Sequence, residues 1–346
     1  MTLAPCAHLL WQQRPRGAAG NHAASGNPRF AWLEADRPVP VREDGRMPHR
    51  QRLAALGVDR LIDAHTHWFP ENVMRKIWGY FHRHNWPIAY EMAPERRLDW
   101  LLNNGVRHFT TLNYAHRPAM AAWLNEWSAE FAARTPQAIP FGTFYPEAGV
   151  ADYVRTAIEE YGLRGFKLHV RVGAMALTDR LLRPAFEQVE AAGLPMVLHI
   201  GTAPEPGEFT APRFLHGLLA AHPRLRVVIA HMGGWEFEEY LGLAERNPRV
   251  FLDTTMVFVG FNACDPFPPA LLPRLAGIGE QVLFGSDYPI IPYPLSHAVE
   301  GILDLPLPDG VKRGILGANA ARLFGVTVQP GDGGADGPHG PQPVTP

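Results

Sequence analysis

Two histidines separated by one residue, His65 and His67, follow a short apolar run that begins at Leu61. In a β-strand, side chains two residues apart point to the same side of the sheet. Both imidazoles would therefore leave the end of such a strand together, as two ligands of one metal ion must. Taken alone the pair is weak evidence, because histidine pairs on strands are more often hydrogen-bonded to the protein or exposed to solvent.

The elements that would position these histidines alternate between two kinds of segment. Eight short runs rich in apolar or β-branched residues are candidate strands: 60–65, 106–112, 139–144, 164–170, 196–200, 226–231, 249–254 and 281–286. Between most of them lie stretches of helical period: 71–84, 118–134, 151–161, 179–192, 212–221, 235–246 and 269–277. A unit of strand and helix repeated eight times, at about 30 residues per unit, predicts a (β/α)8 barrel.

The strands themselves support a parallel sheet. Segments such as 196–199 and 227–230 are nearly continuous apolar runs, which is expected of strands that are covered on both faces. A doubly wound open sheet is the alternative architecture. It lacks its usual support, because no Gly-x-Gly-x-x-Gly follows the first candidate strand.

In a barrel of this kind, chemistry takes place at the carboxyl ends of the strands. Beyond His65 and His67, the predicted strand ends carry further chemically capable side chains: Lys167, His169, His199, His231 and Asp287. Histidines scattered at random would not fall at the ends of four of eight predicted strands. Imidazole and carboxylate are the ligands that a divalent, zinc-like ion prefers, so the set as a whole predicts a metal site.

The chain resembles the amidohydrolase superfamily, and more narrowly the amidohydrolase-related branch that includes the aminocarboxymuconate-semialdehyde decarboxylase-like enzymes. The features that carry the resemblance are Ile62-Asp-Ala-His-Thr-His67, the strand of His199, His231-Met-Gly-Gly234, Phe284-Gly-Ser-Asp-Tyr-Pro289 and the closing segment 315–324. They cover residues 60–325 in the family's order. The resemblance implies a metal-dependent barrel in which His65, His67, His199 and Asp287 are metal ligands and His231 polarises the substrate or transfers a proton.

The chemistry of these residue types agrees with the implied roles. A zinc-like ion with one open position lowers the pKa of bound water to about 7. Asp287 is suited to accept the proton of that water, and His231 to polarise a carbonyl or protonate a leaving group. The alternatives are a solvated turn aspartate before Pro289 and a histidine that only orients a ligand.

Lys167 leaves the number of metal ions open. In binuclear relatives, a lysine at the end of strand 4 is carboxylated and bridges two ions. In the branch that this chain resembles most, one ion is usual, and Lys167 would then pair with a substrate carboxylate together with Arg171. We expect one ion, most simply Zn²⁺. Trp68, which follows His67, is the best candidate for an aromatic wall of the substrate pocket.

Composition sets the remaining bounds. The chain has 346 residues, of which 46% are hydrophobic, and its 32 Lys and Arg residues are balanced by 34 Asp and Glu. This is enough for one large α/β domain, and the absence of a basic excess argues against nucleic-acid binding. Two cysteines cannot form a disulfide framework, and no apolar run reaches the length of a membrane span, so a cytoplasmic location is expected. The first segment does not resemble a signal peptide, so export is not expected.

The ends of the chain differ from its centre. Residues 1–56 are rich in Ala, Gly, Pro and Arg and are predicted to be a partly disordered extension, with Met47 as an alternative translation start. Residues 328–346 are rich in Gly and Pro and are predicted to be a disordered tail. The barrel is therefore expected to span 57–327.

The sequence predicts an enzyme that acts on a small organic molecule. Our first hypothesis is a hydrolase that attacks an amide, ester or lactone carbonyl with metal-activated water. The alternative is a metal-dependent decarboxylase of an aromatic or unsaturated carboxylate, for which the same ligands would serve. No Gly-x-Ser-x-Gly supports a serine hydrolase. By analogy with relatives, the enzyme is expected to be a homodimer.

Overall fold

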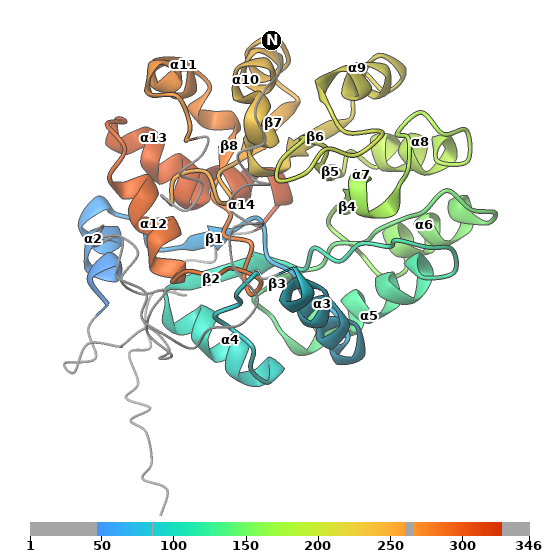
Figure 1. Ribbon diagram of the computed structural model, residues 1–346, viewed down its shortest axis with the longest axis horizontal. Coiled ribbons are helices and arrows are strands. Elements are labelled where there is room, and N and C mark those ends of the chain that lie inside the picture. The colour runs from blue at the N-terminus through green and yellow to red at the C-terminus, as the bar shows by residue number, and fades with distance from the viewer. Residues whose placement is uncertain (1–46, 85, 260–265, 327–346) are drawn as a thin grey trace, which may run out of the picture.

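Eight short parallel strands form a barrel in the computed structural model, which describes residues 47–84, 86–259 and 266–326. The strands in these residues are β1 (Leu61–Asp63), β2 (Val106–Thr110), β3 (Ala138–Ile139), β4 (Phe166–His169), β5 (Pro195–His199), β6 (Arg226–Ile229), β7 (Val250–Asp253) and β8 (Val282–Leu283). Figure 1 shows them at the centre of the molecule, surrounded by the helices. The predicted (β/α)8 barrel is confirmed, and the open sheet is excluded by the way the strands close.

Regular pairing gives two sheets, ordered β1-β2-β3 and β4-β5-β6-β7-β8. Two irregular seams join them into a closed barrel. At one seam Gly142 forms a parallel bridge to Phe166 at the start of β4. At the other, the Ala64 amide donates to the Phe284 carbonyl over 2.8 Å, and Thr66 bridges to Tyr288. The chain segments that follow β1 and β8 are therefore hydrogen-bonded neighbours.

The predicted strand 139–144 is the one that differs most from the structure, because β3 ends at Ile139. The next residue is Pro140, which has no N–H to donate to a ladder. The chain remains extended enough for the Gly142 bridge to β4, so the barrel closes despite the interruption.

The predicted helical stretches all contain helices: α3 (Glu71–Arg83), α5 (Ala121–Arg134), α6 (Val150–Glu159), α8 (Arg183–Ala191), α9 (Pro212–Ala221), α10 (Phe237–Arg246) and α11 (Leu272–Gly277). The closing segment forms η5 (Gly314–Ala318) and α14 (Asn319–Phe324). The sequence analysis missed α2 (Pro48–Leu56), α4 (Pro94–Asn103), α7 (Val170–Gly173), α12 (Leu295–Leu303) and α13 (Asp309–Arg313). The proline at the start of α4, followed by Glu95, was an overlooked signal for a helix start.

Side chains alternate between two buried layers along the strands. In β5, Met196 and Leu198 pack in the large core between barrel and helices, whereas Val197 packs in the smaller core inside the barrel. Phe324 of α14 belongs to the same inner core, where its ring contacts Phe141. Both faces of the strand are apolar because both are covered, and the inward register of Val197 continues to His199 at the strand end.

The predicted extension 1–56 and tail 328–346 lie outside the described residues except for 47–56, where the chain forms α2. This helix lies beside α12, and Arg52 donates to the Asp304 carboxylate over 2.6 Å. Among the described helices, none combines the length and apolar character that a bilayer crossing needs.

Gly317 gives a test of how tightly the closing segment packs on β1. A Cβ at this position would lie 2.2 Å from the backbone oxygen of Arg60. We expect Gly317→Ala to lower the free energy of unfolding by about 1–3 kcal/mol, because the backbone must move to relieve the overlap. Urea denaturation monitored by circular dichroism measures this change. Gly277→Ala is the control, because a Cβ there meets nothing within 4 Å, and its midpoint should not fall.

Candidate metal centre

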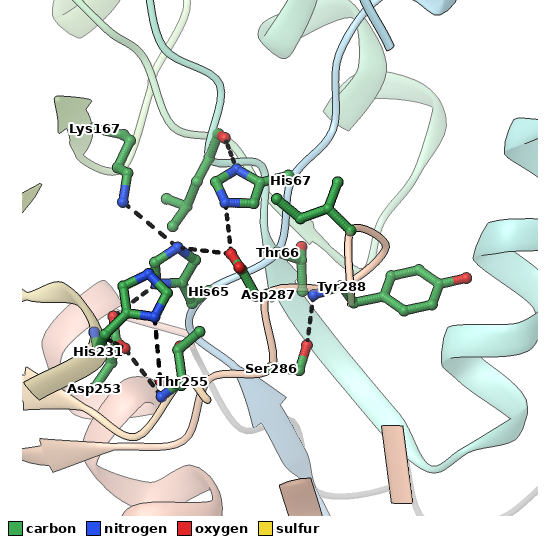
Figure 2. A network of polar contacts seen from close by, with 12 residues as sticks. His65, Thr66, His67, Lys167, His231, Asp253, Thr255, Ser286, Asp287 and Tyr288 are labelled. Carbon is green, nitrogen blue, oxygen red and sulfur yellow. Dashed lines mark hydrogen bonds and ion pairs between the residues drawn. The ribbon is translucent and has the colours of Figure 1, made fainter. Parts of the chain in front are cut away.

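Polar side chains from five strand ends meet at the carboxyl end of the barrel (Figure 2). His65 and His67 follow β1, Lys167 lies on β4, His231 follows β6, Asp253 ends β7 and Asp287 follows β8. The closeness of β1 and β8 explains the core of the cluster, because the Asp287 amide donates to the His65 carbonyl over 2.8 Å. This backbone contact holds the two residues side by side.

The centre of the cluster is the carboxylate of Asp287. Its Oδ1 lies 2.8 Å from Nε2 of His67 and 3.4 Å from Nε2 of His65. His65, His231 and Asp287 each offer one ligand atom, and these three atoms lie within 4.8 Å of one another. An ion about 2.0–2.2 Å from each nitrogen and oxygen ligand fits among atoms at such separations. The donor set therefore suits a divalent cation.

Three of the imidazoles are oriented by hydrogen bonds on the ring edge away from the cluster. Nδ1 of His67 donates to the Leu112 carbonyl over 2.7 Å, and Nδ1 of His231 donates to the Thr255 carbonyl over 3.2 Å. Nδ1 of His65 donates to the Asp253 carboxylate over 2.8 Å. Because each proton lies on Nδ1, each Nε2 keeps its lone pair for a ligand, which is the usual arrangement around metal-binding histidines.

The charges of these groups also suit metal binding. Burial would raise the pKa of Asp287, but the close contact with His67 and the nearby His65 and His231 hold that pKa well below its ordinary value. Burial and the neighbouring Lys167 lower the pKa of His65 to about 3. At neutral pH the carboxylate is therefore ionised and the imidazole is neutral, and these are the forms that coordinate a cation.

Strained backbone surrounds the same residues. Asp287, His231 and Met232 adopt positive φ angles of 72°, 56° and 51°, a region that side chains other than glycine seldom occupy. After Met232 the chain continues through two glycines, and the Gly233 carbonyl approaches Gly201 so closely that a Cβ there would lie 2.1 Å away. Strain of this kind concentrates at functional sites.

His199 lies beside the cluster of three rather than within it. Its ring stacks on His169 with centroids 4.0 Å apart and an angle of 12° between planes, because the two residues are register partners on β4 and β5. Nε2 of His199 lies 3.3 Å from the Ala203 carbonyl. The ring centroid is 4.7 Å from that of His231, so the predicted ligand role of His199 stays a prediction.

Lys167 is fully buried, and its Nζ lies 3.5 Å from Nε2 of His65. Burial lowers the pKa of Lys167 to about 8, although the carboxylates of Asp253 and Asp287 oppose that shift. Among the residues that the structure describes, no carboxylate lies within ion-pair distance of this ammonium, and its predicted contact with a substrate carboxylate stays a prediction.

The two other predicted substrate contacts, Trp68 and Arg171, stay predictions, and in this structure both side chains already have partners. Trp68 is buried with its ring between Phe109 and Phe131, at centroid distances of 5.1 and 5.0 Å, because the residue after His67 points to the opposite side, into the core. The guanidinium of Arg171 is already paired with the Glu205 carboxylate. A substrate carboxylate would therefore compete with Glu205 for Arg171.

Two residues of the site were missed by the sequence analysis. Asp253 ends β7 and binds His65, and its signal was an acidic residue inside the predicted strand 249–254. Tyr114 lies two residues beyond the predicted strand 106–112, and its ring lies between His67 and His169, with centroids 5.6 and 5.1 Å away. Both positions follow from the rule that strand ends line the site.

A family model described as amidohydrolase matches residues 62–326. A search of curated proteins found no match.

Three solved structures illustrate the similarity of the fold. An uncharacterized TIM-barrel protein from Bordetella bronchiseptica has 24% identity and a TM-score of 0.60, covering 77% of this chain and 98% of that one. A 5-carboxyvanillate decarboxylase from Sphingomonas paucimobilis has 20% identity and a TM-score of 0.55, and the match covers 78% of this chain and 100% of that one. A dihydroxybenzoic acid decarboxylase from Polaromonas, with bound manganese and the inhibitor 2-nitroresorcinol, has 17% identity and a TM-score of 0.57, covering 78% and 97%. At these identities the likeness shows the fold.

Proposed function

The chain belongs to the amidohydrolase family, whose model matches it over residues 62–326, and from this premise we propose that it is a metal-dependent, non-oxidative decarboxylase of an aromatic carboxylate. The observation that carries the proposal is the buried ammonium of Lys167 beside the His65, His231 and Asp287 cluster. Structural neighbours named as decarboxylases of aromatic acids favour this reaction over the hydrolysis that was our first hypothesis from the sequence.

His65, His67 and Asp287 would hold the ion, with His199 as the further ligand that the sequence predicts. A divalent ion held by these residues would supply Lewis-acid stabilisation of the negative charge that develops as carbon dioxide leaves. Manganese accompanies one neighbour, and zinc suits the same imidazole and carboxylate donors, so either metal fits the proposal.

The protein's own side chains divide the remaining work. Lys167 binds the substrate carboxylate by a charge-assisted hydrogen bond. As the bond between ring and carboxylate breaks, its electron pair stays on the ring carbon and carbon dioxide leaves. Nε2 of His231 takes up a proton from solvent water and passes it to that carbon, while its Nδ1 remains bound to the Thr255 carbonyl. The net change is the replacement of a carboxylate by a proton.

Hydrolysis is the second candidate because Lys167 also lies where a carboxylated lysine would approach the cluster, 3.5 Å from His65. One experiment separates the two reactions. Protein loaded with Mn²⁺ or Zn²⁺ is incubated in ¹⁸O-water with dihydroxybenzoates, 5-carboxyvanillate and a panel of aryl lactones, esters and amides.

Decarboxylation gives carbon dioxide in equal amount to the substrate lost and no ¹⁸O in the aromatic product. Incorporation of ¹⁸O without carbon dioxide supports the hydrolase. A fully loaded protein that converts neither class contradicts the proposal.

Metal content gives an independent prediction. We expect elemental analysis of protein purified without chelator to find about one equivalent of metal per chain, both in the wild type and in Lys167→Ala, because the donors within reach of one another surround a single position. Two equivalents that fall to one or none in Lys167→Ala would instead make this lysine a bridging ligand.

A further inference from the structure

Asp253 forms hydrogen bonds with two residues of the candidate metal centre, His65 and His231. It is the last residue of β7 and is completely buried. Its Oδ2 accepts the Nδ1 proton of His65 over 2.8 Å. Its Oδ1 accepts the backbone N–H of His231 over 2.9 Å. One carboxylate therefore contacts the ring of one metal-capable residue and the backbone of another (Figure 2).

The backbone contacts of Asp253 reach the ring of His231 as well. Oδ1 also accepts the backbone N–H of Thr255 over 3.2 Å, and the carbonyl of the same threonine accepts the Nδ1 proton of His231. His231 has the strained φ angle of 56°, so its conformation needs the support of fixed partners. Asp253 supplies that support directly at the His231 backbone and, through Thr255, at the His231 ring.

The contact with His65 decides where the imidazole carries its proton. A carboxylate only accepts hydrogen bonds, so the bond to Asp253 requires a proton on Nδ1. The neutral ring then has its lone pair on Nε2, which faces Asp287 at 3.4 Å. If Nδ1 lost its acceptor, the proton would be free to move to Nε2 and to block the position that a metal ion needs.

We propose that Asp253 is a positioning residue that holds His65 in its Nδ1–H tautomer and fixes His231, so that both Nε2 atoms face the metal position. This inference deepens the proposed function and rests on its metal centre. The position of the proton in the metal-free protein is separate from the reaction, and it can be measured whatever the substrate is.

Asp253→Asn is the decisive variant. With its single oxygen facing the amides of His231 and Thr255, the asparagine presents its NH₂ group to Nδ1 of His65. A ring nitrogen that faces a donor must be unprotonated, so His65 is expected to change to the Nε2–H tautomer. In the alternative rotamer the asparagine oxygen faces His65 and its NH₂ group faces the backbone N–H groups of His231 and Thr255. That arrangement costs more free energy, because two buried N–H groups lose their acceptor.

Asp63→Asn provides a matched control. Asp63 is another completely buried carboxylate beside His65, but its Oδ1 accepts the backbone N–H groups of His65 and Ser286 and its Oδ2 accepts the Ser286 hydroxyl. The hydroxyl can turn and accept from an asparagine NH₂ group. This variant therefore changes a buried carboxylate that contacts the His65 backbone, without touching the His65 ring.

Two measurements test the proposal. Nitrogen-15 NMR of histidine-labelled, metal-free protein reports the tautomer of His65, and we expect Nδ1–H in the wild type and Asp63→Asn but Nε2–H in Asp253→Asn. Competition for Zn²⁺ against a chromophoric chelator reports affinity, and we expect a loss of about 10- to 100-fold in Asp253→Asn alone.

The proposal is overturned if Asp253→Asn keeps the Nδ1–H form and the wild-type affinity. If that variant does not fold, the wild type decides, because a His65 ring without a protonated, slowly exchanging Nδ1 contradicts the proposal directly. A wild-type protein that has the Nδ1–H tautomer but binds no Zn²⁺ or Mn²⁺ would instead contradict the metal centre of the proposed function and leave the positioning of His65 intact.

Discussion

Asp287→Asn is expected to lower kcat/KM at least about 100-fold in the metal-loaded protein and to weaken metal binding. The physical reason is the loss of the negative charge at the centre of the cluster, 2.8 Å from His67 and 3.4 Å from His65. The variant should still fold, because asparagine tolerates the positive φ of this position and its NH₂ group can donate to Nε2 of His67. Loss of a proton-transfer group alone typically costs about 10²–10⁴-fold.

The measurements are steady-state decarboxylation with a substrate from the panel above and metal content by elemental analysis. Asp304→Asn is the control, since this aspartate is exposed on the outside of the barrel and pairs with Arg52. Wild-type turnover together with a full equivalent of metal in Asp287→Asn would show that the carboxylate is not part of the centre. An equal loss in Asp304→Asn would point to folding rather than chemistry.

Much of the architecture was predictable because the strands are covered on both sides. The strand segment 196–198 is apolar on every residue, and this continuous pattern distinguishes a barrel wall from a half-exposed sheet. The short β3 was not predictable from hydrophobicity, because Pro140 interrupts the ladder while the surrounding residues remain apolar. Helices α2 and α4 were missed because each lies outside the regular succession of one strand and one helix.

The candidate site was predictable as a position but not as a geometry. The rule that strand ends carry the chemistry placed His65, His67 and Asp287 together. It could not show that the Trp68 side chain faces the core. Beyond the end of a strand, the direction of a side chain depends on how the backbone continues to pair, as in the bridge between Thr66 and Tyr288. Asp253 was missed because an aspartate at the end of a strand is also a common turn residue, and only the contact with His65 distinguishes the two.

Lys167→Met is expected to lower activity and, in the metal-free protein, to raise stability at neutral pH. Methionine fills a similar volume without the charge, so the substrate carboxylate loses a charge-assisted hydrogen bond of about 1.5–3 kcal/mol, or roughly 10- to 100-fold in kcat/KM. Lys76→Met on the exposed face of α3 is the control for the loss of a lysine. Unchanged kcat/KM in Lys167→Met would remove the substrate contact from the proposed function.

The gain in stability follows from the pKa of Lys167, which burial lowers to about 8 from an ordinary value of 10.5. Between these two values the unfolded chain binds the proton more tightly than the folded one, so the stability of the wild type rises with pH across that range. Below about pH 8 the folded protein bears the full cost of the buried charge, about 3 kcal/mol at most, and methionine removes that cost. Urea denaturation of chelator-treated protein should therefore find Lys167→Met more stable than the wild type at pH 7, with a difference that narrows between pH 8 and 10. A wild type that is the more stable of the two at pH 7 would mean that Asp253 and Asp287 more than offset the burial of the ammonium, and that the lysine is a structural counter-ion instead of a charge held ready for substrate.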